Sequence, residues 1–166
     1  MSLIDSSYFV EDISVPNISG SHPAASVNLA SLNRAILTYE RDYLTRLLGP
    51  TLYDEFITDL AASEPWATGL RDELRDTTNL ISPIAFYVWY YWMRRNATAI
   101  TGSGAAEAKH ENATTVSPAV DMCEAYNKAM RMTWDVIDYL NEHADDLPSA
   151  RVTESNWLHP INPFGI

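Results

Sequence analysis

The stretch from Leu80 to Met93, LISPIAFYVWYYWM, constrains the fold of this chain more than any other feature. It predicts a helix from Pro83 to about Thr98, because Ser82 followed by proline is a typical helix start. The predicted helix carries apolar or aromatic side chains on every side, and such a helix is surrounded by protein. We therefore expect it at the centre of a helical bundle. The run is shorter than the roughly 20 apolar residues of a membrane span.

Two other long helices are expected to surround the central one. Apolar residues spaced by three and four predict a helix over residues 28–48, which Gly49 ends. The same spacing predicts a helix over about 118–143. Its expected apolar stripe is Val120, Cys123, Met130, Trp134, Ile137 and Leu140. With two shorter helices between the first long helix and the central one, the chain is predicted to be mainly α, with a helical-bundle domain over residues 28–146.

Three segments are predicted to lie outside the bundle core. Prolines and a glycine interrupt residues 1–27, which are expected to form an extended N-terminal arm. Small and polar residues dominate a long internal loop at 100–117, and residues 147–166 are predicted to be an apolar C-terminal docking tail. A monomer has no need of apolar material in such segments, so we expect them to contact neighbouring chains. The candidate interaction residues are Tyr8, Phe9, Val10, Gly102, Gly104, Trp157, Leu158 and Phe164.

The charge and cysteine content limit the classes of partner. Aspartate and glutamate number 22 against 11 lysines and arginines, which gives a net charge of −11. This balance argues against a nucleic-acid binder held by phosphate contacts and against an anionic membrane surface. The one cysteine, Cys123, excludes an intrachain disulfide and a four-cysteine zinc site, and fits a reducing compartment.

The sequence contains no reactive constellation that we can identify. His110 and Glu111 begin an H-E-x-x-H pattern, but Thr114 occupies the position of the second histidine. The remaining histidines lie in three different segments, and acidic pairs are best interpreted as solvated charge. Glu40 and Arg41, for example, are predicted to lie on a solvated helix face. We therefore expect no catalytic residues, no metal, no cofactor and no enzymatic activity.

Several short motifs follow one another in a characteristic order along the chain. They are YERDYL at 39–44, LLGPTLY at 47–53, the aromatic helix, Thr101-Gly102, KHENA at 109–113, Ser117, Tyr126-Asn127 and Asp138-Tyr139-Leu140. This series resembles a family of small virion proteins of tailed phages and prophages, notably those of Bacteroidetes bacteria. Such proteins are similar to the head–tail connector or adaptor proteins beneath the portal. The resemblance covers roughly residues 1–148 and rests on packing and turn residues.

The resemblance implies a structural protein of the bacteriophage virion, assembled in the cytoplasm of the bacterial host. It implies a portal-associated ring, commonly of twelve or thirteen copies, that contacts the portal and the tail or other connector proteins. DNA would pass through the lumen of that ring without being specifically bound, and the family carries no catalytic residues to transfer. Two alternatives stay open: a small helical adaptor or inhibitor that binds a host protein, and a helical hydrolase whose site forms only in the fold.

Overall fold

The computed structural model describes residues 2–16, 18, 23–96, 99–101, 104–106, 118–153 and 157–162. Within these ranges the α-helices are α1 (Pro23–Leu48), α2 (Pro50–Ala62), α3 (Pro65–Glu73), α4 (Pro83–Asn96) and α5 (Ala119–Glu142). The 3-10 turns are η1 (Ser6–Tyr8), η2 (Glu11–Ile13) and η3 (Ala144–Asp146). Strands β1 (Ala99–Thr101) and β2 (Gly104–Ala106) form an antiparallel ribbon between α4 and α5. The predicted mainly-α bundle is confirmed, and part of the predicted internal loop is this ribbon.

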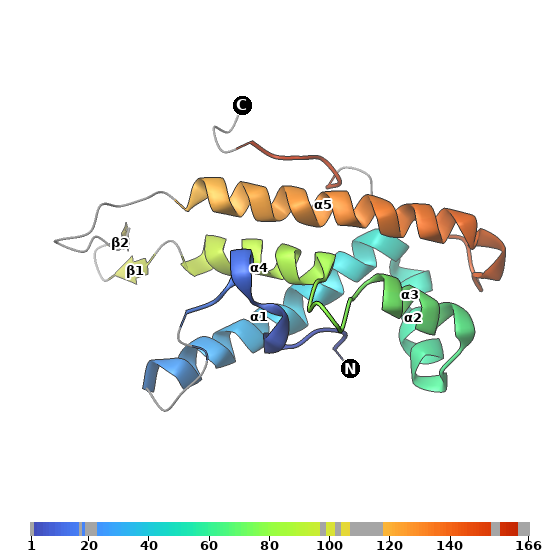
Figure 1. The fold of residues 1–166 in the computed structure, drawn as a ribbon, viewed down its shortest axis with the longest axis horizontal. Helices are drawn as coiled ribbons and strands as arrows, with labels where there is room; N and C mark the ends of the chain where they lie inside the picture. The colour runs from blue at the N-terminus through green and yellow to red at the C-terminus, as the bar shows by residue number, and fades with distance from the viewer. Residues whose placement is uncertain are drawn as a thin grey trace.

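Helix α4 lies between α1 and α5 (Figure 1), as its lack of a polar face predicts. The side chains of Trp89 and Trp92 are only 5% and 7% exposed. The start of the helix is also as predicted, since the Ser82 hydroxyl accepts a hydrogen bond from the Ile84 N–H at 3.2 Å. The same hydroxyl donates to the Leu74 carbonyl at 2.8 Å, which ties α4 to the end of α3.

Helix α1 begins at Pro23, five residues before the predicted start. Pro23 is one of the prolines expected to interrupt an extended arm, and that expectation was wrong for it, because a proline at the first helical position lacks only an N–H that would have no helical partner. The helix ends at Leu48, and Gly49 has a φ of +80°, in the region that favours glycine. A Cβ at Gly49 would lie 2.9 Å from the Val152 carbonyl oxygen. Glycine therefore also allows the C-terminal segment to approach, and the Val152 N–H donates to the Leu48 carbonyl at 3.2 Å.

Helices α2 and α3 form one end of the molecule, beside the C-terminal end of α5 (Figure 1). Leu52, Phe56 and Leu60 point into the core from α2, as their spacing predicts. The Trp66 indole N–H donates to the Asp59 carboxylate at 2.9 Å and links the two helices. Helices α2 and α3 thus form a helical hairpin at this end of the molecule, beside the stack of α1, α4 and α5.

The buried face of α5 differs in part from the predicted stripe. Cys123, Met130, Ile137 and Leu140 are buried as expected. Two other predicted members, Val120 and Trp134, are 48% and 47% exposed, so the prediction was wrong for them. The buried face is centred near Tyr126 and Thr133, and a rotation of about 100° per residue places Trp134 at its edge. The buried Thr133 hydroxyl is satisfied by the Tyr43 hydroxyl at 2.7 Å.

Candidate functional site

The N-terminal arm belongs to the chain's own core. Tyr8 and Phe9 are 4% and 3% exposed, and η1 and η2 pack on α1, α4 and α5. The expectation that the N-terminal segment lies outside the core was therefore wrong for its described residues 2–15, and Tyr8 and Phe9 are not available to a neighbour. Val10, the third candidate of this segment, is 41% exposed.

Glu40 anchors this arm from within α1. Its side chain is buried, and its carboxylate accepts the backbone N–H groups of Leu3 at 3.0 Å and Ile4 at 3.3 Å. The Ser2 hydroxyl donates to the same carboxylate at 2.8 Å. Burial raises the pKa of Glu40 above its usual range, although the hydrogen bonds from the arm oppose this shift. The predicted solvated position of Glu40 was wrong, whereas Arg41 is exposed as predicted.

Side chains of the bundle also bind carbonyl groups of the arm. An Arg75 guanidinium N–H donates to the Leu3 carbonyl at 2.7 Å, and the Trp89 indole N–H donates to the Ser14 carbonyl at 3.4 Å. These bonds satisfy backbone groups in a segment that lacks a regular ladder of its own. The arm is therefore docked by specific side chains as well as by apolar packing.

The C-terminal tail is also docked by specific side chains and by apolar packing. Trp157 and Leu158 are 5% and 3% exposed, so the expectation that they contact a neighbouring chain was also wrong. The Trp157 ring packs edge-on against Tyr43 and Tyr87, with ring centroids 5.3 Å and 5.6 Å away. These aromatic contacts bury the indole against side chains of α1 and α4.

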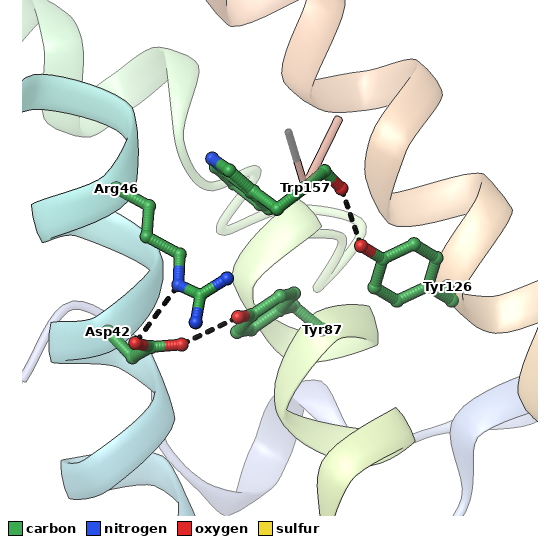
Figure 2. A network of polar contacts seen from close by, with 5 residues as sticks. All are labelled: Asp42, Arg46, Tyr87, Tyr126 and Trp157. Atoms are coloured by element: carbon green, nitrogen blue, oxygen red, sulfur yellow. Dashed lines mark hydrogen bonds and ion pairs between the residues drawn. The ribbon is translucent and has the colours of Figure 1, made fainter. Parts of the chain in front are cut away.

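Two neighbouring residues of α5 hold the backbone of the tail. The Tyr126 hydroxyl donates to the Trp157 carbonyl (Figure 2). The Asn127 side chain forms a pair of bonds with Ile161: its amide donates to the Ile161 carbonyl at 2.8 Å and its carbonyl accepts the Ile161 N–H at 2.7 Å. The tail thus lies along α5 and is fixed at two points four residues apart.

A polar network lies beneath the tail, where Trp157 meets α1 and α4 (Figure 2). The Asp42 carboxylate accepts the Tyr87 hydroxyl at 2.6 Å and the Arg46 Nε–H at 3.1 Å. Burial, reinforced by the bond to Asp42, raises the pKa of Tyr87, and burial raises the pKa of Tyr126 to about 12. Both phenols therefore stay protonated at neutral pH and act as hydrogen-bond donors. Tyr126 donates its hydroxyl proton to the tail, whereas Tyr87 donates its proton to Asp42.

The described candidates for reactive chemistry, His143 and His159, lie in separate surroundings. His143 stacks on Tyr139 with ring centroids 4.2 Å apart, and His159 is exposed. His22 and the His110-Glu111 pair lie outside the described residues. In the part of the chain that the structure describes, no three histidine, cysteine or acidic side chains are grouped as metal ligands.

The other candidate residues have separate positions. Gly104 begins β2 and pairs with Thr101, whereas Gly102 and Phe164 lie outside the described residues. Cys123 is buried, and burial raises the pKa of its thiol. None of the helices within the described ranges is both long and apolar enough to span a membrane.

The outward side of α1 carries a stripe of five exposed residues, which we call the α1 stripe: Val27, Ala30, Arg34, Leu37 and Arg41. Their spacing of three and four places them on one helix face. Val27 and Leu37 are 67% and 68% exposed. The stripe includes no carboxylate, since α1 contains only Glu40, which is buried, and Asp42, which binds Tyr87 and Arg46. It is therefore a basic and apolar surface on an acidic protein.

The outward side of α5 has the opposite character in its C-terminal half. We call Trp134, Asp135, Asp138 and Glu142, all exposed, the α5 acidic face. It belongs to a larger acidic end formed with α2 and α3. Residues 50–73 and 135–146 contain eleven carboxylates and one basic residue, so −10 of the net charge of −11 lies on these two segments. The charge of the molecule is thus concentrated at one end.

A shallow groove of about 680 Å³ lies between η2, α4 and α5. Phe86 forms part of its floor, and the Lys128 ammonium lies 4.5 Å from the centre of that ring. Lys128 also pairs with Asp12 at 3.5 Å across the groove. Asp121, Glu124 and Arg131 also line the groove, so it is a charged surface with one ion pair across it.

The fold and the surfaces define a mainly-α bundle whose two terminal segments are docked by its own side chains. The sequence model of the family DUF6712, a family of unknown function, matches residues 44–156, which is more than half of the chain. The chain belongs to this family. No curated protein and no solved structure matches it.

Proposed function

We propose that this protein is a structural virion protein, a head–tail connector subunit that forms a ring between portal and tail. The observation that carries the proposal is that the packed helices α1, α4 and α5 present two unlike outer faces. The basic and apolar α1 stripe and the α5 acidic face point away from α4 on its two sides. A ring subunit needs two different surfaces of this kind, because one face of each copy must meet a different face of the next.

The distribution of charge supports the passage of DNA without binding. Helices α2 and α3 carry six carboxylates and one arginine over residues 50–73, and they form an end of the molecule (Figure 1). Repeated around a ring, such a surface repels phosphate, and the repulsion is strongest at low ionic strength. The resemblance of the motif series to connector proteins points to the same function.

The proposal is tested by imaging purified protein, and particles that contain it, by electron microscopy. We expect closed rings, and we expect the protein in the particle beneath the portal. A protein that is absent from every particle, or that turns over a small substrate, would contradict the proposal. A host protein recovered in a one-to-one complex with the isolated chain would favour the alternative of a small adaptor.

The behaviour toward DNA is tested separately with a duplex at low ionic strength. We expect no detectable binding by the natural chain. The triple variant Asp54→Asn, Glu64→Gln and Glu73→Gln removes three exposed carboxylates from the acidic end and should increase adsorption. Tight binding by the natural chain with a steep dependence on salt would reject the passive lumen and leave the ring itself in place.

A further inference from the structure

We propose that the α1 stripe of one copy binds the α5 acidic face of a second copy of this chain. This inference rests on the proposed function for the identity of the partner and names the two faces that meet. The first argument is exposure. Leu37 and Val27 are two of the most exposed large apolar side chains in the described part of the chain, and they lie on the same face of a long helix.

The second argument is charge complementarity. Arg34 and Arg41 form no ion pair among the described residues, although Arg41 lies 6.0 Å from the centre of the Tyr53 ring. On the α5 acidic face, Asp138 and Glu142 likewise lack an ion pair in the described structure. Two surfaces of opposite charge therefore remain unpaired within a single copy. Their contact would pair the two arginines of the stripe with carboxylates of the acidic face.

The third argument is spacing. Arg34 and Arg41 are seven residues apart, as are Asp135 and Glu142, so each pair spans about 10.5 Å along its helix. The two arginines enclose the exposed side chain of Leu37 on α1. On α5, the exposed side chain of Trp134 directly precedes Asp135. Two helices packed through these faces thus combine an apolar centre with charged flanks, which is the usual anatomy of a protein interface.

The fourth argument is the place of the two faces in the fold. Helix α4 lies between the N-terminal half of α1 and α5 (Figure 1), and each face is exposed on its own helix. No ion pair among the described residues joins the two faces within one copy. A contact between them adds the next copy beside the first and leaves the same two faces open for further copies. The geometry therefore produces a repeating assembly rather than a closed dimer.

The first experiment measures self-association of the full chain by sedimentation at low and moderate ionic strength. We expect the natural chain to associate, more strongly at low salt. The double variant Val27→Asp and Leu37→Asp should weaken association at least about tenfold. The matched control is Val152→Asp, because Val152 has the same exposed fraction as Val27, 67%, and lies off both faces. A natural chain that remains monomeric, or variants that all associate equally, would overturn the inference.

The second experiment uses charge reversal, so that a loss cannot be ascribed to misfolding. One variant carries Arg34→Glu and Arg41→Glu, and the other carries Asp138→Arg and Glu142→Arg. Each should be monomeric alone, because its two faces then have charges of the same sign. A mixture should associate again, since the reversed α1 stripe meets the reversed acidic face and the two natural faces also meet. A mixture as monomeric as its components would refute the contact.

The outcomes separate this inference from the proposed function. Rings and particles that form normally with the Val27→Asp and Leu37→Asp chain would keep the connector proposal and reject these two faces. Association that depends on both faces, in a protein absent from virions, would keep the interface and reject the connector.

Discussion

The N-terminal arm is docked by a buried charge, whereas residues 157–162 of the C-terminal tail are docked by neutral groups. Glu40 accepts backbone N–H groups of the arm inside the core, while Tyr126 and Asn127 bind the tail without carrying charge. A buried carboxylate forms strong hydrogen bonds but loses its hydration, so its contribution to stability depends on whether it is protonated. The neutral groups lose less on burial and are insensitive to pH over a wide range. The two segments therefore look alike in the fold but should respond differently to mutation and pH.

The largest effect is expected from the apolar anchor of the tail. Trp157→Ala removes a nearly buried indole from contact with Tyr43 and Tyr87 and should lower the free energy of unfolding by about 3–5 kcal/mol. Trp134→Ala is the control, because its side chain is 47% exposed. Its loss should be about 1 kcal/mol or less in the isolated subunit. Equal losses in urea unfolding would show that the tail contributes little to the subunit.

The next effect concerns the charged anchor of the arm. Glu40→Ala leaves the N–H groups of Leu3 and Ile4 without their acceptor and should cost about 2–5 kcal/mol. Glu40→Gln keeps one acceptor oxygen and should cost less. Amide hydrogen exchange checks the mechanism, because exchange at Leu3 and Ile4 should accelerate in Glu40→Ala. Unchanged protection there would mean that packing alone holds the arm.

A smaller effect is expected at the neutral anchor. Tyr126→Phe removes the bond to the Trp157 carbonyl and should cost about 0.5–1.5 kcal/mol at neutral pH. Tyr53→Phe is a suitable control, since the Tyr53 hydroxyl makes no hydrogen bond with another described residue. The natural chain should also lose stability above pH 10, because the pKa of Tyr126 is about 12 in the folded state and 10 ordinarily. A natural chain and Tyr126→Phe with the same alkaline profile would contradict this assignment.

The smallest effect is expected at acidic pH, from the protonation of Glu40. Its pKa is raised above the ordinary value of 4.5, so the folded chain holds this proton at pH values where the unfolded chain has lost it. The contribution of Glu40 to stability should therefore rise as the pH falls from neutral through the raised pKa to 4.5, and be complete below that. We expect the difference in unfolding free energy between the natural chain and Glu40→Gln to shift in favour of the natural chain over this window. A shift in the opposite direction would show that the arm stabilises the charged form overall.

Much of the architecture was predictable from local patterns. The all-round apolar composition of residues 83–96 places this helix at the centre, because a helix without a polar face must be covered. The end of α1 at Gly49 was equally local, since the backbone there needs a positive φ. These features depend on a few neighbouring residues, and the structure confirms them. A local signal for Glu40 was also present, because it lies four residues from both Ile36 and Leu44 on the apolar stripe.

The partners of the arm and the tail were decided by the tertiary structure alone. The apolar residues Tyr8 and Trp157 in proline-containing segments indicate that something covers them, but composition does not distinguish a neighbouring chain from the chain itself. That choice depends on whether distant residues offer matching hydrogen bonds, as Glu40 does to Leu3 and Tyr126 does to Trp157. The sequence by itself therefore determined the helices and the central layer, whose causes are local. Only the fold decided which apolar surfaces are covered within the subunit and which, like the α1 stripe, stay open, because burial is a property of long-range contacts.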